Sequence, residues 1–230
     1  MEPPRAFAIV VAAGSGSRMG TDEPKAFLPL GGRPMVQRAV EAALSSTAIT
    51  GVVVVAPAGC EARARDVFAS ASPAPIIATG GDTRQDSVRH GLRVVPDEVE
   101  IIVVHDAARP LAPRIAFDDV VRAVAEGADA AIPVLRSADT VKRVRSGLVV
   151  GTEPRDEIGL AQTPQAFRAR LLRDAHERAL VEGWRVTDDA ALVERMGATV
   201  HMVPGDPGNF KITTAHDLTR AVRAWADSRG

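Results

Sequence analysis

The sequence predicts an α/β protein with a doubly wound, mostly parallel β-sheet, and two features of the 230-residue chain support this fold class. First, short runs of apolar and β-branched residues recur, and their near-continuous hydrophobicity is typical of parallel strands buried on both faces. Second, amphipathic stretches long enough for crossover helices separate these runs. Buried strands that alternate with helices predict a sheet covered on both faces.

Each element follows from one of these two patterns. We expect strands at residues 7–13, 51–56, 75–79, 101–105, 130–134 and 199–203. We expect helices at residues 34–46, 61–71, 84–94, 114–126, 169–182, 188–196 and 214–227. Because ligands of such sheets bind beyond the carboxyl ends of the strands, the loops after Ala13, Thr79 and His105 are expected to face one site. The length and the lack of an internal repeat predict a single domain over residues 1–230.

Residues 137–150 depart from the alternation. Residues 140–144 and 148–150 are short alternating runs joined by a turn at 145–147, which predicts a β-hairpin. A lone hairpin is marginal in water unless another surface covers its apolar side. We therefore expect a hairpin arm that projects from the domain and packs against a second subunit to form a homodimer.

The composition excludes several classes of protein. The chain is 46% hydrophobic and 25% charged with a formal net charge of -1, which is ordinary for a globular protein. Its basic residues are dispersed, which argues against a nucleic-acid partner. Neither a signal pattern nor an apolar stretch of the ~18 residues that a membrane span needs is present, so we expect a cytoplasmic protein without a membrane partner. Cys60 is the only cysteine, which excludes an intramolecular disulfide.

The most informative segment follows the first strand, with AAGSGSRMG at residues 12–20 and PKAFLPLGGRP at 24–34. Gly14 and Gly16 allow backbone amides to approach a phosphate closely, and Arg18 and Lys25 supply positive charge. The spacing fits neither a Walker loop nor the GxGxxG fingerprint. The segment predicts a phosphate-binding loop of a different kind.

This segment resembles the signature of the sugar-nucleotide pyrophosphorylase superfamily. Four motifs follow in order: GGDTRQDSV at residues 80–88, VHDAARP at 104–110, ADTVK at 138–142 and QTPQAF at 162–167. Together they resemble the 2-C-methyl-D-erythritol 4-phosphate cytidylyltransferase family, over residues 12 to about 213. The resemblance implies a Rossmann-like nucleotidyltransferase fold and an enzyme that transfers CMP from CTP to 2-C-methyl-D-erythritol 4-phosphate, in non-mevalonate isoprenoid biosynthesis.

The resemblance also implies three groups of site residues. Arg18 and Lys25 are the implied catalytic residues, which stabilise charge on the α-phosphate and on the leaving pyrophosphate. The implied nucleotide contacts are Ala12, Ala13, Gly14, Gly16, Gly81, Asp82, Ser87, Asp106 and Ala107, with Gly81, Asp82 and Ser87 at the cytosine. The implied acceptor contacts are Arg109, Thr140, Arg155, Thr187 and Lys211. Because Thr140 lies on the arm, subunits that exchange arms would share each site.

Asp106 follows the expected strand at 101–105 and so stands at the carboxyl edge of the sheet. Mg²⁺ is usually held by one or two carboxylates together with substrate phosphates, and we therefore expect Asp106 to bind a Mg²⁺ cofactor. His105 lies within the apolar run and is expected to be structural. Asp82 precedes an expected helix and also fits a helix cap.

Two other functions are consistent with the residues. A D-ribitol 5-phosphate cytidylyltransferase shares the chemistry and several motifs and differs in its acceptor. A non-catalytic nucleotide-binding protein on the same fold is expected to lack Arg18, Lys25 or Asp106, and all three are present in this chain.

Overall fold

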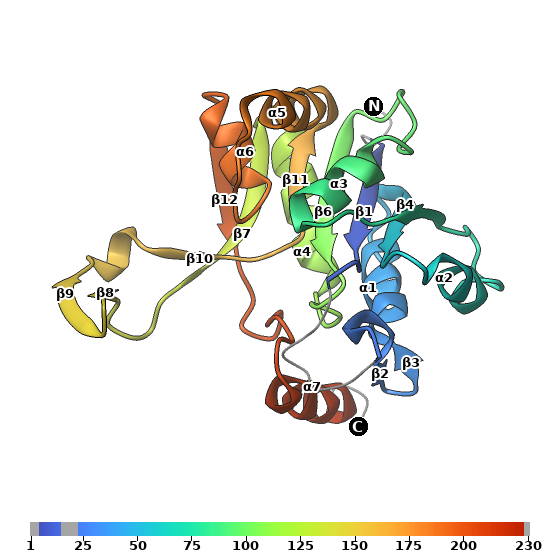
Figure 1. The fold of residues 1–230 in the computed structure, drawn as a ribbon, viewed down its shortest axis with the longest axis horizontal. Coiled ribbons are helices and arrows are strands. Elements are labelled where there is room, and N and C mark those ends of the chain that lie inside the picture. The colour runs from blue at the N-terminus through green and yellow to red at the C-terminus, as the bar shows by residue number, and fades with distance from the viewer. Residues whose placement is uncertain (1–4, 15–22, 228–230) are drawn as a thin grey trace.

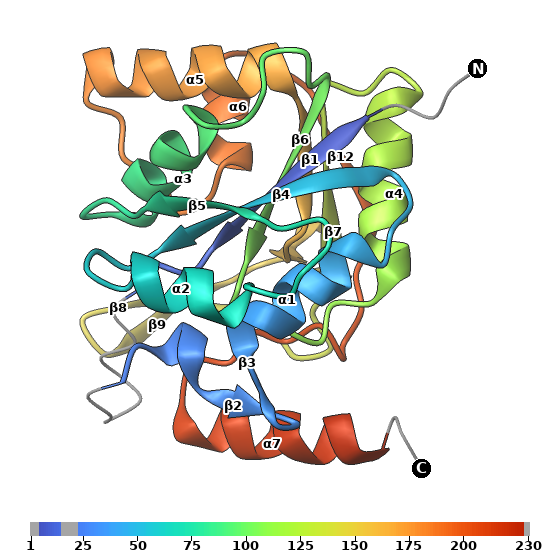
Figure 2. The ribbon, with the colours of Figure 1, turned by 90° about the vertical axis from the view of Figure 1, so that its right-hand side faces the viewer.

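The computed structural model describes residues 5–14 and 23–227, and it confirms the predicted α/β fold (Figure 1). In this part of the chain, an eight-stranded sheet lies between two layers of helices (Figure 2). The strand order is β10-β7-β11-β6-β1-β4-β5, and β12 also pairs with β7. The strands are β1 (Ala6–Val11), β4 (Ile49–Ala56), β5 (Ile76–Thr79), β6 (Ile101–Asp106), β7 (Ala130–Arg136), β10 (Gly159–Ala161), β11 (Gln165–Arg168) and β12 (Val200–Pro204).

The first strand occupies the middle of the sheet, and its register fixes the position of the loops. β1 pairs in parallel with both β4 and β6, and Val11 stands between Val55 on one side and Asp106 on the other. The carboxyl end of β1 therefore brings the glycine-rich segment beside Asp106. This is the edge at which an open parallel sheet binds its ligand.

Helices cover both faces of the sheet, as the amphipathic stretches predict. One face is covered by α1 (Met35–Leu44), α2 (Glu61–Val67) and α4 (Arg114–Ala125), and the other by α3 (Arg84–Leu92), α5 (Ala169–Glu182) and α6 (Ala190–Arg195). Alternate residues of β1 divide between the two cores, because Val10 packs with the first group of helices and Ile9 with the second. No helix among the described residues is long and apolar enough to cross a membrane.

The strands β10 and β11 were missed by the sequence analysis. β11 runs antiparallel between β6 and β7, and β10 pairs antiparallel with the far end of β7. Both strands are short, and β11 begins with the fully buried polar residue Gln165, so no apolar run marks them. The sheet is mostly parallel, as predicted, but it also contains the antiparallel strands β10 and β11, which pair with strands distant in the sequence.

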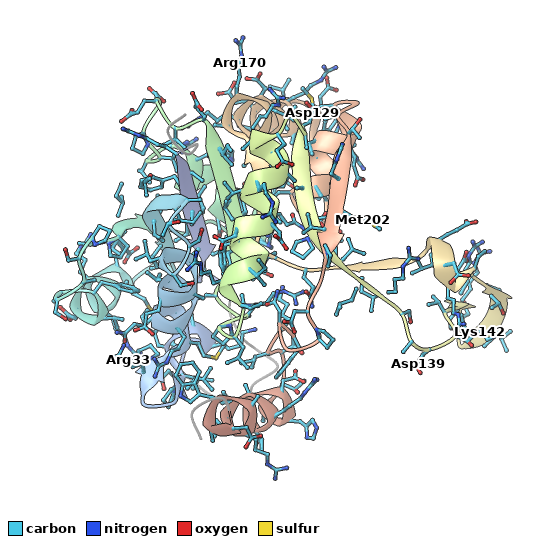
Figure 3. The ribbon with its side chains drawn as sticks, turned by 180° about the vertical axis from the view of Figure 1, so that it is seen from behind. Arg33, Asp129, Asp139, Lys142, Arg170 and Met202 are labelled. Carbon is cyan, nitrogen blue, oxygen red and sulfur yellow. The ribbon has the colours of Figure 1, made fainter. Side chains whose placement is uncertain are left out.

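The predicted hairpin arm is present and consists of β8 (Lys142–Arg145) and β9 (Leu148–Thr152). Its turn residues Ser146 and Gly147 have φ values of 48° and 80°, the positive pair that a tight hairpin turn needs. The arm extends away from the sheet in Figure 1, and Figure 3 shows Lys142 on the arm, Asp139 in the loop before it and Met202 on the sheet. In the part of the chain that the structure describes, the arm's apolar residues Val144, Leu148, Val149 and Val150 are exposed.

The carboxyl-terminal helix α7 (Ala215–Asp227) lies outside the two main layers. It packs beside a small hairpin of β2 (Pro29–Leu30) and β3 (Arg33–Pro34), which the sequence analysis did not predict. A third apolar cluster joins these elements and contains Leu30, Met35, Ile212 and Ala221. The guanidinium group of Arg38 stacks 4.0 Å from the ring centroid of Trp225. The end of the chain is thereby anchored to the segment that follows the glycine-rich loop.

Candidate active site

A cavity of about 390 Å³ opens where β1, β6 and the turn after β5 end, and its size is suited to a small ligand. The described nucleotide-binding candidates all line it: Ala12, Ala13, Gly14, Gly81, Asp82, Ser87, Asp106 and Ala107. Lys25 and Lys211 line it as well. The loops after Ala13, Thr79 and His105 therefore meet at one cavity. Gly16 and Arg18 lie outside the described residues.

One wall of the cavity is the turn between β5 and α3. The Ser87 hydroxyl accepts a hydrogen bond from Gly81 N at 3.1 Å and donates one to Thr83 O at 2.9 Å. A Cβ atom on Gly81 would lie 2.5 Å from Asp86 Cβ, so glycine is required at this position. The N-cap of α3 is Thr83, whose hydroxyl accepts from Asp86 N, and not Asp82. Asp82 is exposed and faces the cavity instead.

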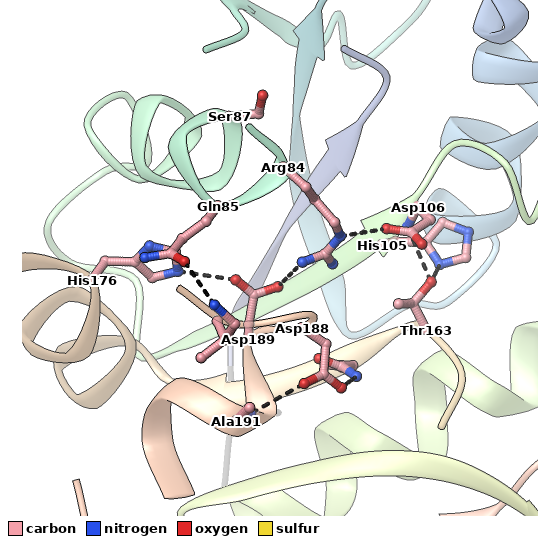
Figure 4. Close-up of polar contacts among 12 residues, drawn as sticks. Arg84, Gln85, Ser87, His105, Asp106, Thr163, His176, Asp188, Asp189 and Ala191 are labelled. Atoms are coloured by element: carbon pink, nitrogen blue, oxygen red, sulfur yellow. Dashed lines mark hydrogen bonds and ion pairs between the residues drawn. The ribbon is translucent and has the colours of Figure 1, made fainter. Parts of the chain in front are cut away.

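A second part of the cavity lining is a cluster of charges around Asp106. Its Oδ1 accepts a hydrogen bond from Arg84 Nε at 3.0 Å, and its Oδ2 accepts one from Lys211 Nζ at 2.6 Å. Arg84 also reaches Asp189, whose Oδ2 lies 2.7 Å from Nη1. Figure 4 shows Arg84 lying between the two carboxylates. Three segments that are distant in the sequence thus meet at one carboxylate.

These contacts fix the charge state of the cluster. Burial disfavours the ionised carboxylate of Asp106, but the charges of Arg84 and Lys211 outweigh it and hold the pKa of Asp106 well below its usual range. Burial also disfavours the charged guanidinium, yet Asp189 and Asp106 together raise the pKa of Arg84 above its usual range. Asp106 is therefore an anion at neutral pH, and it can interact with a cation.

Lys25 begins the short 3-10 helix η2 (Lys25–Phe27), whose Ala26 and Phe27 are buried. Its ammonium group donates a hydrogen bond to Ile212 O at 2.8 Å. The backbone of Ile212 in turn donates to Ala108 O, so the last loop of the chain connects Lys25 with the loop after β6. Lys25 and Lys211 are consequently both held at the cavity by the segment before α7.

His105 is buried, and through Thr163 it helps to hold the backbone of Asp106 in place. Asp106 N donates to the Thr163 hydroxyl, which lies 3.1 Å from His105 Nδ1, and His105 Nε2 lies 3.2 Å from Arg109 O. Each contact pairs a donor with an acceptor when the ring is neutral and Nε2 carries the proton. Burial is the main cause that lowers the pKa of His105 to about 4, and the charges of Arg109 and Arg84 act in the same direction. His105 is therefore structural, as expected from its place in the apolar run.

Comparison with known proteins agrees with this geometry. A sequence model of the 2-C-methyl-D-erythritol 4-phosphate cytidylyltransferase family matches residues 6–224. The chain belongs to this family. A cytidylyltransferase of this name from Prochlorococcus marinus is 41% identical over 93% of this chain and 95% of its own length. Its counterpart from Frankia casuarinae is 46% identical over 95% of this chain and 80% of its own length.

Solved structures of the cytidylyltransferase family share the fold. The 4-diphosphocytidyl-2C-methyl-D-erythritol synthase of Anaerococcus prevotii superimposes with a TM-score of 0.86 at 28% identity, covering 98% of this chain and 100% of that one. The 2-C-methyl-D-erythritol 4-phosphate cytidylyltransferase of Thermus thermophilus superimposes with a TM-score of 0.80 at 32% identity, covering 96% and 99%. The similarity therefore extends over nearly the whole of this cytidylyltransferase chain.

The acceptor candidates of this cytidylyltransferase are more scattered than its nucleotide candidates. Lys211 lies in the cavity, but Arg109, Thr140, Arg155 and Thr187 are not among the residues that line it. Arg109 Nη1 donates to Asn209 O at 2.6 Å, and burial lowers its pKa. Thr140 and Arg155 are exposed beside the arm, and Thr187 is exposed in the loop before α6.

Sequence reasoning missed several residues of the cytidylyltransferase site. Arg84 was quoted within GGDTRQDSV but given no role, although its position at the first turn of α3 directs it to the carboxyl edge of the sheet. The QTPQAF motif was likewise given no structural role. Thr163 supports Asp106, and Gln162 accepts from Asp206 N and donates to Asn209 O, which fixes the loop before Lys211. Asp189, two residues after the acceptor candidate Thr187, and His176 were given no role either.

Proposed function

We propose that the chain transfers CMP from CTP to 2-C-methyl-D-erythritol 4-phosphate, which yields 4-diphosphocytidyl-2-C-methyl-D-erythritol and pyrophosphate. This is the reaction after which the relatives are named, and the similarity to them extends over nearly the whole chain. The observation that carries it here is that one cavity is lined both by the turn of Gly81 and Ser87 and by the charge cluster of Asp106 and Lys211. The turn suits a pyrimidine edge and the charge cluster suits phosphates.

In the proposed reaction, an anionic phosphate oxygen of the acceptor attacks the α-phosphorus of CTP. The new P–O bond forms as the bond to the bridging oxygen breaks, and the electron pair leaves with pyrophosphate. Because the nucleophile is already an anion, no general base has to remove a proton. The barrier lies in bringing negative groups together and in stabilising the charge that develops on the α-phosphate and the leaving group.

The residues of the chain are suited to that task. We assign Lys25 to the charge that develops on the α-phosphate and the leaving group, and Arg18 to the same role from outside the described residues. Lys211, already within 2.6 Å of Asp106, is assigned to positioning of the acceptor phosphate. Gly81, Asp82 and Ser87 are assigned to cytosine, whose exocyclic amine distinguishes it from uracil.

We also propose Mg²⁺ as the cofactor. The described residues contain no group of three or more His, Cys, Asp or Glu side chains suited to a metal, so a fully protein-made cage is not present among them. Mg²⁺ does not need one, because one carboxylate together with substrate phosphates and water is sufficient. Asp106, ionised and at the cavity, would hold the ion, which would neutralise phosphate charge. Chelation by EDTA is expected to abolish turnover, and added Mg²⁺ is expected to restore it.

A homodimer through the arm is proposed on the basis of its surface. Val144, Leu148, Val149 and Val150 are between 52% and 70% exposed in the single chain, a grouping of apolar side chains that a second subunit would cover. Thr140 and Arg155 flank this arm, so its packing on a partner would bring them to the partner's cavity. Sedimentation of the purified protein is expected to give a dimer, and Leu148→Glu to give a monomer.

Subunit mixing tests whether the cavity is shared. Lys25→Ala and Arg155→Ala proteins are each expected to have low activity. If each site combines Lys25 of one subunit with Arg155 of the other, a mixed dimer contains one intact site, and mixing after subunit exchange restores part of the activity. Mixtures that never exceed the average of the two separate variants would show that the site is made by one chain.

The main test is pyrophosphate release by the purified protein from CTP and Mg²⁺, comparing 2-C-methyl-D-erythritol 4-phosphate with D-ribitol 5-phosphate. Release with methylerythritol phosphate alone is the expected result. Release with ribitol phosphate alone would retain the chemistry and change the acceptor, and no release with either would overturn the assignment. Because CTP is a cytoplasmic nucleotide, we propose a cytoplasmic location.

A further inference from the structure

A chain of polar contacts runs behind the cavity wall and ends at Asp106 (Figure 4). His176 Nε2 lies 3.0 Å from Asp189 Oδ1, Asp189 Oδ2 lies 2.7 Å from Arg84 Nη1, and Arg84 Nε lies 3.0 Å from Asp106 Oδ1. The proposed reaction uses Asp106 but leaves the other three residues without a role. They come from three different elements: Arg84 starts α3, His176 lies in α5, and Asp189 precedes α6.

The two residues of this series that lie furthest from Asp106, His176 and Asp189, are fully buried. The side chains of His176 and Asp189 are each 1% exposed, and a carboxylate at such depth is costly unless it is paired and hydrogen-bonded. Burial disfavours the ionised form of Asp189, but the charge of Arg84 and the hydrogen bond from His176 lower its pKa. Both carboxylate oxygens of Asp189 are therefore engaged, one by each partner.

Among the described residues, the one hydrogen bond of the His176 side chain is the bond to Asp189. Its Nδ1 is buried without a hydrogen-bond partner there, while Nε2 donates to the carboxylate. A ring that makes one side-chain hydrogen bond, and makes it to a buried carboxylate, orients that carboxylate. The result is an aspartate with one fixed rotamer, aimed at Arg84.

Arg84 is the member of this series that lies between the buried pair and Asp106 and reaches the cavity. It lines the cavity, and its side chain is 25% exposed, in contrast to the two residues behind it. Nε and Nη1 are fixed by the two carboxylates, and Nη2 has no hydrogen-bond partner among the described residues. A guanidinium group whose plane is set by two carboxylates presents its remaining N–H groups in a defined direction, which suits an oxyanion.

The position of Arg84 also indicates which substrate it meets. Its guanidinium contacts Asp106, whose other oxygen is bound by Lys211, the residue assigned above to the acceptor phosphate. Ser87, on the same helix, points away from this contact in Figure 4, and its hydroxyl accepts a hydrogen bond from Gly81 N. Arg84 therefore belongs to the acceptor side of the cavity and not to the cytosine side.

We propose that Arg84 donates from Nη2 to an oxygen of the acceptor phosphate, and that Asp189, supported by His176, is the positioning residue that holds Arg84 for this contact. This inference rests on the proposed function, because it takes the side of Asp106 and Lys211 as the acceptor's. Asp189 and His176 touch no substrate and act through Arg84 alone.

The test is a double-mutant cycle on Asp189 and Arg84, measured with CTP and methylerythritol phosphate. Asp189→Asn is expected to lower kcat/KM for the acceptor by about 10- to 100-fold, the usual cost of losing a group that orients a ligand-binding residue. Calorimetric affinity for CTP in the absence of acceptor is expected to stay at the wild-type value. In an Arg84→Met background, Asp189→Asn is expected to have no further effect on the acceptor.

Two further variants keep the proposal testable if Asp189→Asn is unstable. His176→Leu removes the donor and is expected to lower kcat/KM for the acceptor, whereas the side-chain amide of His176→Gln can donate from the position of Nε2 and is expected to restore it. Asp129→Asn is the matched control, because Asp129 pairs with Arg168 at the opposite, amino-terminal end of β7 (Figure 3). It is expected to leave the kinetics unchanged.

Additive effects of Asp189→Asn and Arg84→Met, or an equal loss of CTP affinity, would overturn the inference, because a merely structural aspartate disturbs both substrates and does so independently of Arg84. Equal activities of His176→Leu and His176→Gln would overturn the role of His176. Wild-type protein that turns over no acceptor would overturn the proposed function, and the acceptor role of Arg84 with it, before any variant is compared.

Discussion

The ammonium group of Lys25 donates a hydrogen bond to the backbone carbonyl oxygen of Ile212, 2.8 Å away and 187 residues further along the chain. Ile212 is fully buried in the apolar cluster beneath α7, and its own N–H group donates to Ala108 O. The position of the principal cation of the cavity is therefore set by a backbone atom, whose location depends on packing near the carboxyl terminus.

Replacement of Lys25 by arginine is expected to be poorly tolerated. The compact ammonium fits beside Ile212 O, whereas a planar guanidinium group is longer and directs its donors elsewhere. We expect kcat to fall by about 10²- to 10³-fold, as for the loss of other preorganised electrostatic groups. Circular dichroism establishes that the variant is folded, and near-normal turnover would refute the assignment of Lys25.

Truncation of Ile212 is expected to destabilise the protein. The side chain is fully buried against Leu30, Met35 and Ala221, and Ile212→Ala leaves a cavity there, at a cost of about 2–5 kcal/mol. Urea denaturation measures the loss. Val222→Ala, on the exposed side of α7, is the matched control and is expected to change stability by less than about 0.5 kcal/mol. Equal losses in the two variants would contradict this account of the cluster.

A methyl group at Gly81 is expected to weaken nucleotide binding. The added Cβ would lie 2.5 Å from Asp86 Cβ, and relief of this overlap costs about 1–3 kcal/mol and moves the turn that lines the cavity. Calorimetry with CTP is expected to show a lower affinity for Gly81→Ala. Gly151→Ala places its Cβ no closer than 3.9 Å to any neighbour and serves as the control. Unchanged CTP affinity in Gly81→Ala would show that this turn does not contact the cytosine base.

Acid is expected to abolish the contribution of Asp217 to stability. Hydrogen bonds from the Thr213 side chain, from Thr213 N and from Thr214 lower its pKa from 3.8 to about 2. A carboxylate with a lowered pKa stabilises the fold fully above its unfolded pKa, and this stabilisation disappears as the pH falls to the folded value. The side chain is only partly buried and water screens its charge, so the contribution is expected to be about 1 kcal/mol or less.

The measurement for Asp217 is urea denaturation of wild-type protein and Asp217→Asn across acidic pH. The difference in unfolding free energy is expected to be constant above about pH 5 and to shrink as the pH approaches 2. Asp217 N also donates to the Thr214 hydroxyl, and Thr214 N donates to the Asp217 carboxylate, which makes a reciprocal cap at the start of α7. A difference that is independent of pH would show that the charge of Asp217 is irrelevant.

The elements that local sequence patterns could predict are those with continuous signals. The apolar runs at β1, β4 and β6 gave strands with boundaries within a few residues, and the helix expected at 169–182 matches α5 at both ends. β11 was missed because its pairing partners, β6 and β7, lie far away in sequence and its first residue is a buried glutamine. Nothing local distinguishes such a segment from a loop.

In the candidate site, too, local signals could be predicted from the sequence and long-range contacts could not. Loops at the carboxyl ends of strands could be chosen from topology, and the family motifs identified Lys25, Asp106 and Lys211. The direct contact of Lys211 with Asp106 could not be predicted, since 105 residues separate them and each had been assigned to a different ligand. Asp189 was overlooked because a buried aspartate in a loop has the same local sequence signal as an exposed one. Burial is decided by the packing of α5 and α6.

The dependence of the cavity on Ile212 and Lys211 also bears on the order in which the protein becomes active during its synthesis. The strands and the turns that line most of the cavity precede residue 107, so they leave the ribosome early, and domains tend to fold from the amino terminus during translation. Two of the groups that complete the charge pattern belong to residues near the end of the chain. A nascent polypeptide can therefore acquire most of its sheet before Lys211, and the Ile212 carbonyl that binds Lys25, are in place.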